Sequence, residues 1–126
     1  MKVADTSFLV AFFDADDRRN VQARDAFAST NPLIICPEVL VETLRVIKAK
    51  AGRGAADAAL EDLMRVANVE WAQESDIPAT WRIYEAEAPL SFVDASVVQL
   101  CIRRAVEPLT FDDRQAKAVT KRLTKR

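Results

Sequence analysis

The opening stretch of this chain decides its fold: residues 1–7 read Met-Lys-Val-Ala-Asp-Thr-Ser, and an unbroken apolar run follows at residues 8–13. A short strand, a polar turn and a buried helix are the beginning of a β-α unit. Ligands of an open parallel sheet bind just beyond the carboxyl ends of its strands, where Asp5 lies. Taken alone, Asp5 is more simply interpreted as the N-cap of the next helix, because Asp, Ser and Thr are preferred there.

Further along the chain, short apolar runs alternate with amphipathic segments. We expect strands at residues 2–5, 33–36, 69–71 and 107–110. We expect helices over residues 8–13, 17–29, 37–50, 55–66, 78–87, 91–104 and from residue 112 onward. The 126 residues are enough for one domain and one core. This alternation predicts a three-layer α/β/α sandwich around a four-stranded, mainly parallel sheet.

Composition excludes several classes of site. The chain has no histidine, which removes Ser-His-Asp and Cys-His catalysis and the usual histidine zinc sites. Any metal must then be held by oxygen atoms, which favours Mg²⁺ or Mn²⁺. Cys36 and Cys101 lie in apolar surroundings, so we expect buried free thiols in a reducing cytoplasm. We expect a cytoplasmic protein, because no apolar segment approaches a membrane span and the N-terminus lacks a secretory signal.

The charge is distributed unevenly along the chain. Residues 117–126 contain five of the 18 basic residues and no acid, so the rest of the chain has 13 basic residues against 19 acids. A basic tail on an acidic body suggests a polyanion or an acidic partner near the C-terminus. The alternative is a solvated, partly frayed last helix.

Three other acids deserve comparison with Asp5. Asp112 also follows a predicted strand and precedes a helix, and Gln115 three residues later completes a capping-box pattern. Asp94 stands three residues after Ser91 in another such pattern. Each of these acids therefore has an ordinary explanation as a helix cap.

Glu42 lies in the middle of a predicted helix, on the face opposite its apolar stripe. Its ordinary explanation is a solvated position in contact with Arg45. These separate explanations do not account for how the four acids are arranged together. We expect that two aspartates at strand ends, one at a helix start and one glutamate after a buried strand can all reach one edge of a parallel sheet.

These residues resemble the PIN domain, and specifically the small toxin ribonucleases of the VapC type. The matching pieces are Val-Ala-Asp-Thr-Ser at 3–7, Pro-Glu-Val-Leu-Val-Glu at 37–42, Ser-Phe-Val-Asp-Ala at 91–95 and Leu-Thr-Phe-Asp at 109–112. Together they cover nearly the whole chain in the family's order. The chain departs from the pattern at Gln115, where the family has an apolar residue, and in its short basic tail, where a fifth strand is expected.

The resemblance implies a divalent-metal-dependent endoribonuclease that cleaves RNA phosphodiester bonds with a metal-activated water. Crowded carboxylates repel one another unless cations neutralise them, so the acid cluster itself also points to a metal site. Asp5 and Asp94 are the expected direct ligands of Mg²⁺, with Mn²⁺ as an alternative. Glu42 and Asp112 are expected to bind through water or to complete a second metal position.

Four neighbouring residues are expected to support these acids. Thr6, Ser7 and Thr110 are candidates for orienting the carboxylates or the scissile phosphate. Asp113 is a candidate substitute for Asp112. The family further implies products with a 5′-phosphate and a 3′-hydroxyl, a homodimer, and a small antitoxin protein that obstructs the acidic cleft.

The basic tail then has a more specific interpretation. Arg114, Lys121 and Arg122 follow Asp112 and are expected to contribute affinity for the RNA substrate rather than chemistry. The competing interpretation assigns them to an acidic segment of the antitoxin, or to no partner.

Other functions fit the sequence less well. A non-catalytic PIN-like module that binds RNA or protein is the main alternative, although four acids argue against it. A phospho-acceptor receiver domain needs an aspartate after the third strand and a lysine after the last, and neither is present. A haloacid-dehalogenase-like phosphatase needs a second aspartate where Ser7 stands. Nucleotide hydrolysis lacks its Gly-rich phosphate loop.

Overall fold

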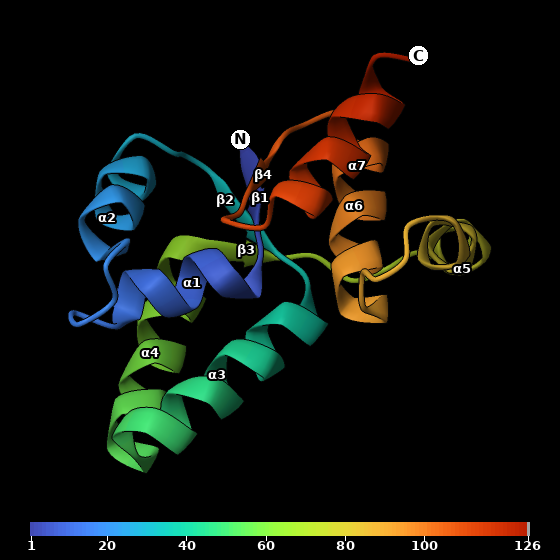
Figure 1. Cartoon of the computed structure of the whole chain (residues 1–126). Helices are drawn as coiled ribbons and strands as arrows, with labels where there is room; N and C mark the ends of the chain where they lie inside the picture. The colour runs from blue at the N-terminus through green and yellow to red at the C-terminus, as the bar shows by residue number, and fades with distance from the viewer. Residues whose placement is uncertain (126) are drawn as a thin grey trace.

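The computed structural model describes residues 1–125 and contains four parallel strands. Their order across the sheet is β3-β2-β1-β4, so the N-terminal strand lies at the centre (Figure 1). The strands are β1 (Lys2–Ala4), β2 (Leu33–Ile35), β3 (Ala67–Val69) and β4 (Pro108–Leu109). The predicted four-stranded parallel sheet is thereby confirmed.

Helices cover both faces of this sheet. In Figure 1, α1 to α4 lie on one side and α5 to α7 on the other, which gives the predicted three layers. The helices are α1 (Thr6–Phe13), α2 (Asn20–Ala28), α3 (Pro37–Ala51), α4 (Arg53–Val66), α5 (Asp76–Ala86), α6 (Phe92–Arg104) and α7 (Asp113–Leu123). Within residues 1–125 there is no fifth strand, because the basic tail continues α7.

Several boundaries differ from those expected from the sequence. Strand β3 begins two residues before the expected start, and Glu70 leaves the ladder with its backbone N–H still bonded to the carbonyl of Ile35. Helix α4 includes Gly54 and starts after Gly52, whose φ of 90° suits a residue without a Cβ. The break between α3 and α4 is therefore a single residue.

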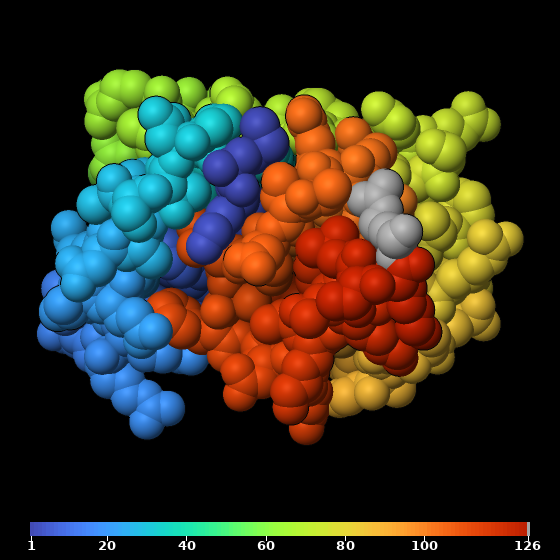
Figure 2. Space-filling model, turned by 90° about the horizontal axis from the view of Figure 1, so that it is seen from above, coloured from blue at the N-terminus to red at the C-terminus, as the bar shows by residue number. Residues whose placement is uncertain are grey.

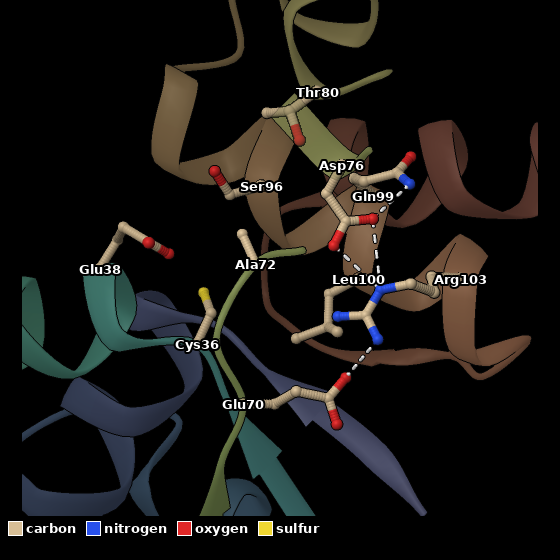
Figure 3. A pocket seen from close by; sticks show the side chains of 10 residues that line it. All are labelled: Cys36, Glu38, Glu70, Ala72, Asp76, Thr80, Ser96, Gln99, Leu100 and Arg103. Atoms are coloured by element: carbon tan, nitrogen blue, oxygen red, sulfur yellow. Dashed lines mark hydrogen bonds and ion pairs between the residues drawn. The ribbon is translucent and has the colours of Figure 1, made fainter. Parts of the chain in front are cut away.

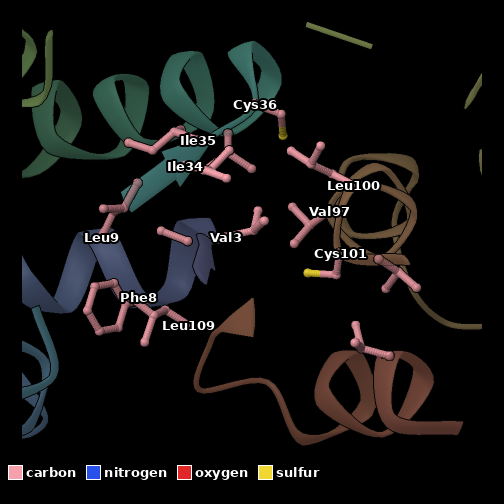
Figure 4. Packing of buried hydrophobic residues seen from close by; sticks show 14 of the residues in the cluster. Val3, Phe8, Leu9, Ile34, Ile35, Cys36, Val97, Leu100, Cys101 and Leu109 are labelled. Atoms are coloured by element: carbon pink, nitrogen blue, oxygen red, sulfur yellow. The ribbon is translucent and has the colours of Figure 1, made fainter. Parts of the chain in front are cut away.

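The core lies where the sheet meets α1, α3 and α6 (Figure 4). Strand β2 is fully buried, as its continuous apolar run predicts. Both thiols are buried and unpaired, which confirms that interpretation. Burial raises the pKa of each of Cys36 and Cys101 to about 12, so both are protonated at neutral pH.

The strand register brings the chemistry-bearing segments to one edge. Val3 pairs with Ile34, and Ala4 pairs with Leu109, so β1, β2 and β4 end side by side. The segments that begin at Asp5, Cys36 and Thr110 therefore leave the sheet together. None of the helices in residues 1–125 has the length and hydrophobicity to cross a membrane.

Candidate functional site

Asp5 lies at the end of the central strand, and its side chain is only 3% exposed. One carboxylate oxygen, Oδ1, accepts hydrogen bonds from the Ser7 hydroxyl at 2.8 Å and the Phe8 backbone N–H at 3.1 Å. The other, Oδ2, accepts one from the Thr110 hydroxyl at 2.7 Å. Asp5 is therefore the N-cap of α1, as the simpler interpretation predicts, and it is also held by a residue 105 positions away.

The hydroxyl groups of Thr110 and Ser7 are each oriented by a backbone N–H group. The Thr110 oxygen accepts the backbone N–H of Asp112 at 2.9 Å, and the Ser7 oxygen accepts that of Phe111 at 3.0 Å. Because each oxygen receives an amide proton, its own proton is free to point at Asp5. These two hydroxyls thus orient the carboxylate and tie the start of α1 to the segment after β4.

The electrostatics of Asp5 are unusual for a carboxylate. Burial raises its pKa above the ordinary value, and the negative charge of Asp94 acts in the same direction. The hydrogen bonds from Thr110, Phe8 and Ser7 offset only part of this increase. A buried acid with a second acid nearby is the arrangement that a cation stabilises.

Asp94 lies in the first turn of α6 and completes the expected capping box. Its Oδ2 accepts from the Ser91 backbone N–H at 3.2 Å, while the Ser91 hydroxyl accepts from the Asp94 backbone N–H at 3.1 Å. No hydrogen bond from residues 1–125 reaches Asp94 Oδ1. The cap thus fixes one oxygen and leaves the other without a hydrogen bond among the described residues.

Asp112 is the N-cap of α7, as expected, but the predicted capping box does not form, because the side-chain amide of Gln115 bonds to the carbonyl of Asp94 instead of accepting from Asp112. Its Oδ1 accepts from the backbone N–H groups of Arg114 at 3.0 Å and Gln115 at 3.4 Å. Within the described chain its Oδ2 receives no hydrogen bond. Asp113 is exposed in the first turn of the same helix.

Gln115 is a site residue whose contact the sequence does not predict. It is 0% exposed, and its Nε2 donates to the backbone carbonyl of Asp94 at 3.2 Å. Its Oε1 is buried without a partner among the described residues. The only signal in the sequence is the departure from the family's apolar residue at this position.

Glu42 is half-buried in the second turn of α3 and lines an open groove. Glu38, Trp71 and Val93 line the same groove, so Glu42 faces the chain segment that leads directly to Asp94. Glu38 sits one helical turn before Glu42, a spacing that could have marked it as a second acid of this face.

The donor set fits a divalent ion of the magnesium type. Within residues 1–125, no three His, Cys, Asp or Glu side chains come close enough to enclose a metal together. Mg²⁺ commonly uses one or two carboxylates and keeps several waters. The oriented pair of Asp5 and Asp94 meets that requirement. Thr6, whose Oγ1 is buried without a partner in the described chain, lies beside it in sequence.

A second polar cluster lies near the groove (Figure 3). Arg103 donates from Nε to both oxygens of Asp76, at 3.0 and 3.2 Å, and its Nη1 lies 3.0 Å from Glu70. Gln99 donates to Asp76 at 3.0 Å, and Arg104 pairs with Glu70. This cluster joins the end of β3 to α5 and α6 and has no unpaired acid facing the site.

The basic residues of α7 are partly engaged within the protein. Lys121 Nζ and Arg122 Nη1 lie 3.2 and 2.7 Å from Glu87 Oε1. Figure 2 shows α7, in red, lying against the orange segment that precedes it in the chain. Arg114 is exposed, and its side chain makes no ion pair within residues 1–125. Lys121 and Arg122, which the sequence predicts to contact RNA, therefore also hold the loop before α6 through Glu87.

The fold and this edge of acids define a PIN domain, and the chain belongs to the PIN-domain family, whose model matches residues 2–121. The chain is also similar to the toxin VapC20 of Mycobacterium tuberculosis, described as cleaving the sarcin-ricin loop. That structure has a TM-score of 0.81 and 27% sequence identity, over 94% of this chain and 95% of VapC20. The VapC-type resemblance is thereby confirmed.

A second solved structure, PAE2754 from Pyrobaculum aerophilum, shares the fold. Its TM-score is 0.66 at 18% identity, over 98% of this chain and 93% of that one. No protein of curated function matches the chain. Together the matches place the chain in a family of nucleases and toxins.

Proposed function

We propose that this protein is a divalent-metal-dependent endoribonuclease of the toxin type. The observation that carries the proposal is the Asp5 carboxylate, which is buried, oriented by Ser7 and Thr110, and paired with the like charge of Asp94. A buried, charged carboxylate beside a second negative charge destabilises the folded protein unless a cation neutralises it.

Mg²⁺, with Mn²⁺ as the alternative, would be held by Asp5 and Asp94, while Glu42 and Asp112 complete the acidic edge. When bound, the ion supplies an activated water and neutralises charge on the phosphate. The residues of the chain itself orient the carboxylates that would hold the ion. Ser7 and Thr110 hold Asp5, the capping box of α6 fixes one oxygen of Asp94, and the N-cap of α7 fixes one oxygen of Asp112, which leaves the second oxygen of each acid for the ion.

We further propose RNA as the substrate and a small antitoxin protein as the inhibitor. The support is the likeness to VapC20, a toxin described as cleaving the sarcin-ricin loop. An antitoxin segment that covers the acidic edge would exclude RNA and water from Asp5.

We also propose that the protein forms a homodimer. Three aromatic rings pack together on α5 and the start of α6, with centroid separations of 5.4, 5.9 and 6.4 Å. Trp81, Tyr84 and Phe92 are nevertheless 51, 39 and 43% exposed. Monomeric proteins rarely expose a contiguous aromatic patch, so a second copy of the chain is the occupant we assign.

One observation favours the alternative of a non-catalytic module. No three acids of residues 1–125 enclose a metal together. Such a module would bind RNA or a protein without cleaving it.

One experiment separates these functions. Purified protein is incubated with total RNA in Mg²⁺ or EDTA, and any new ends are mapped. We expect cuts with a 5′-phosphate and a 3′-hydroxyl only in Mg²⁺, and none from the variant Asp5→Asn/Asp94→Asn. Cleavage by the folded double variant would refute the assignment of these two acids, and RNA binding without cleavage would support the module.

A further inference from the structure

Two adjoining hollows run along α3 from the acidic edge. The first, of about 460 Å³, lies between α3, the segment after β3 and the start of α6, and Glu42, Arg45 and Trp71 line it. The second, of about 360 Å³, lies between α3 and α4, and Arg45, Lys48 and Arg53 line it. Both are lined by Val41 and Arg45, so the two hollows adjoin along α3 and are described together as one groove. We refer to it as the α3 groove.

The charge along the α3 groove changes sign. Its end near the site has the acids Glu38 and Glu42, and its far part has Arg45, Lys48 and Arg53. Arg45 and Lys48 are exposed, and neither makes an ion pair within residues 1–125. Arg53 has only a solvent-exposed contact of 3.8 Å with Asp57, which neutralises little of its charge.

Two of the cations of α7, Lys121 and Arg122, differ in this respect. Lys121 and Arg122 share the carboxylate of Glu87, and a phosphate must compete with it. Arg45 and Lys48 have no such competitor among the described residues. An approaching polyanion therefore gains more from Arg45 and Lys48 than from Lys121 and Arg122.

An aromatic side chain completes the groove. Trp71 follows β3, lines the same hollow as Glu42 and Arg45, and is 73% exposed. An exposed indole beside unpaired cations is the combination that binds unpaired nucleotides, because the ring stacks on a base while the cations contact phosphates. Bases within a duplex are already stacked and do not offer this face.

We propose that the α3 groove is the path of single-stranded RNA next to the acidic site, with Arg45 and Lys48 on backbone phosphates and Trp71 stacked on a base. The inference deepens the proposed function and rests on it for the identity of the polymer. It moves the expected RNA contacts from Lys121 and Arg122 to the face beside Glu42.

The first test measures binding of a short single-stranded RNA as a function of salt, in EDTA so that the RNA stays intact. Arg45→Gln/Lys48→Gln is compared with Arg18→Gln/Arg82→Gln, which makes the same charge change at exposed positions outside the groove. We expect the groove variant to lower the slope of log K against log salt by about 1.4, since each single-strand phosphate contact contributes about 0.7. We expect the control to leave the slope nearly unchanged. Equal slopes in the two variants would overturn the proposal.

The second test concerns the proposed stacking of Trp71 on a base of the RNA. Trp71→Ala should weaken binding of single-stranded RNA about tenfold, Trp71→Phe should retain most of the affinity, and neither should affect a fully paired duplex. Equal losses for duplex and single strand would overturn the stacking role.

Two further measurements keep the alternatives apart. If the groove variants change the mass of the protein in solution but not its salt slope, the groove is an interface between two copies and the proposal is overturned. Because binding is measured without cleavage, a wild-type protein that binds with the expected slope but never cuts RNA would refute the proposed catalysis and leave the groove assignment standing.

Discussion

The side-chain amide of Gln115 donates a hydrogen bond of 3.2 Å to the backbone carbonyl of Asp94. Gln115 is fully buried, and its own backbone N–H lies 3.4 Å from Asp112 Oδ1. One residue thus contacts the backbone of one candidate acid and the carboxylate of another. It fixes the start of α7 against the start of α6, and we infer that it sets the separation of the two acids.

We predict that Gln115→Met uncouples these acids with little effect on folding. Methionine keeps the length of the side chain but cannot donate, and it removes the unpartnered Oε1, so the free energy of unfolding should change by less than about 1 kcal/mol. The RNA cleavage rate should fall and the Mg²⁺ concentration for half-maximal activity should rise. Lys117→Met, at an exposed position of the same helix, is the control. A large loss of stability with an unchanged Mg²⁺ requirement would show a purely structural role.

Whether a contact can be predicted from the sequence depends on how far apart its two residues lie along the chain. Asp5, Ser7 and Thr110 are predictable because each directly follows or nearly follows a strand, and parallel strands end at one edge. The bonds of Gln115 to Asp94 and of Lys121 to Glu87 span 21 and 34 positions between helices. Their partners depend on how α6 and α7 pack, which local patterns do not determine. The late start predicted for β3 has a similar cause, because Ala67 and Asn68 belong to the strand through their pairing with Leu33 and Ile34 of β2, which lie far away in the sequence.

We predict that Asp5→Asn stabilises the metal-free protein. Burial, followed by the charge of Asp94, raises the pKa of Asp5 in the folded state above its ordinary value near 3.8. A raised pKa means that the folded state favours the protonated form, so this contribution to stability is present at low pH and is lost as the pH rises through the folded pKa. Asparagine at this position has no charge, so the variant does not lose this stability as the pH rises, and it retains the N-cap.

The measurement is thermal unfolding at neutral pH, with and without Mg²⁺. The wild-type melting temperature should rise on addition of Mg²⁺, whereas that of Asp5→Asn should start higher and respond less. Asp25→Asn, at an exposed position of α2, is a control for the change of charge. A variant that melts lower than the wild type in EDTA would contradict the prediction.

We predict that Glu42→Gln impairs catalysis without destabilising the protein. Glu42 is half-buried and lines the groove. Glutamine keeps an oxygen there but removes the negative charge, which we propose repels the other acids in the metal-free protein and attracts the metal ion. The cleavage rate should fall at least tenfold, while the free energy of unfolding changes by less than about 0.5 kcal/mol. Glu38→Gln, one turn earlier in the same groove, tests whether the effect is specific. Wild-type cleavage by Glu42→Gln would reject its role.

The last prediction concerns the cluster in which Arg103 joins Asp76 and Glu70. Asp76 is 4% exposed, and although burial raises its pKa, the hydrogen bonds from Gln99, the Gln73 backbone N–H and Arg103 more than compensate, so the net shift is downward. The pKa of Glu70 is lowered first by the Arg104 hydrogen bond, with Arg103 adding to it. Lowered pKa values contribute stability above the ordinary values of 3.8 and 4.5, and this stability is lost as the pH falls through the folded values.

Arg103→Met keeps the aliphatic stem and removes the charge, so it should lower the free energy of unfolding by about 2 to 3 kcal/mol at pH 7. The deficit should shrink as the pH falls through the lowered folded pKa values of these two acids, because the acids are then protonated in both proteins and the lost ion pairs no longer differ. Urea unfolding of Arg103→Met, the wild type and the exposed control Arg82→Met across this range measures it. A deficit that stays constant with pH would mean that Arg103 stabilises the fold through packing rather than through its charge.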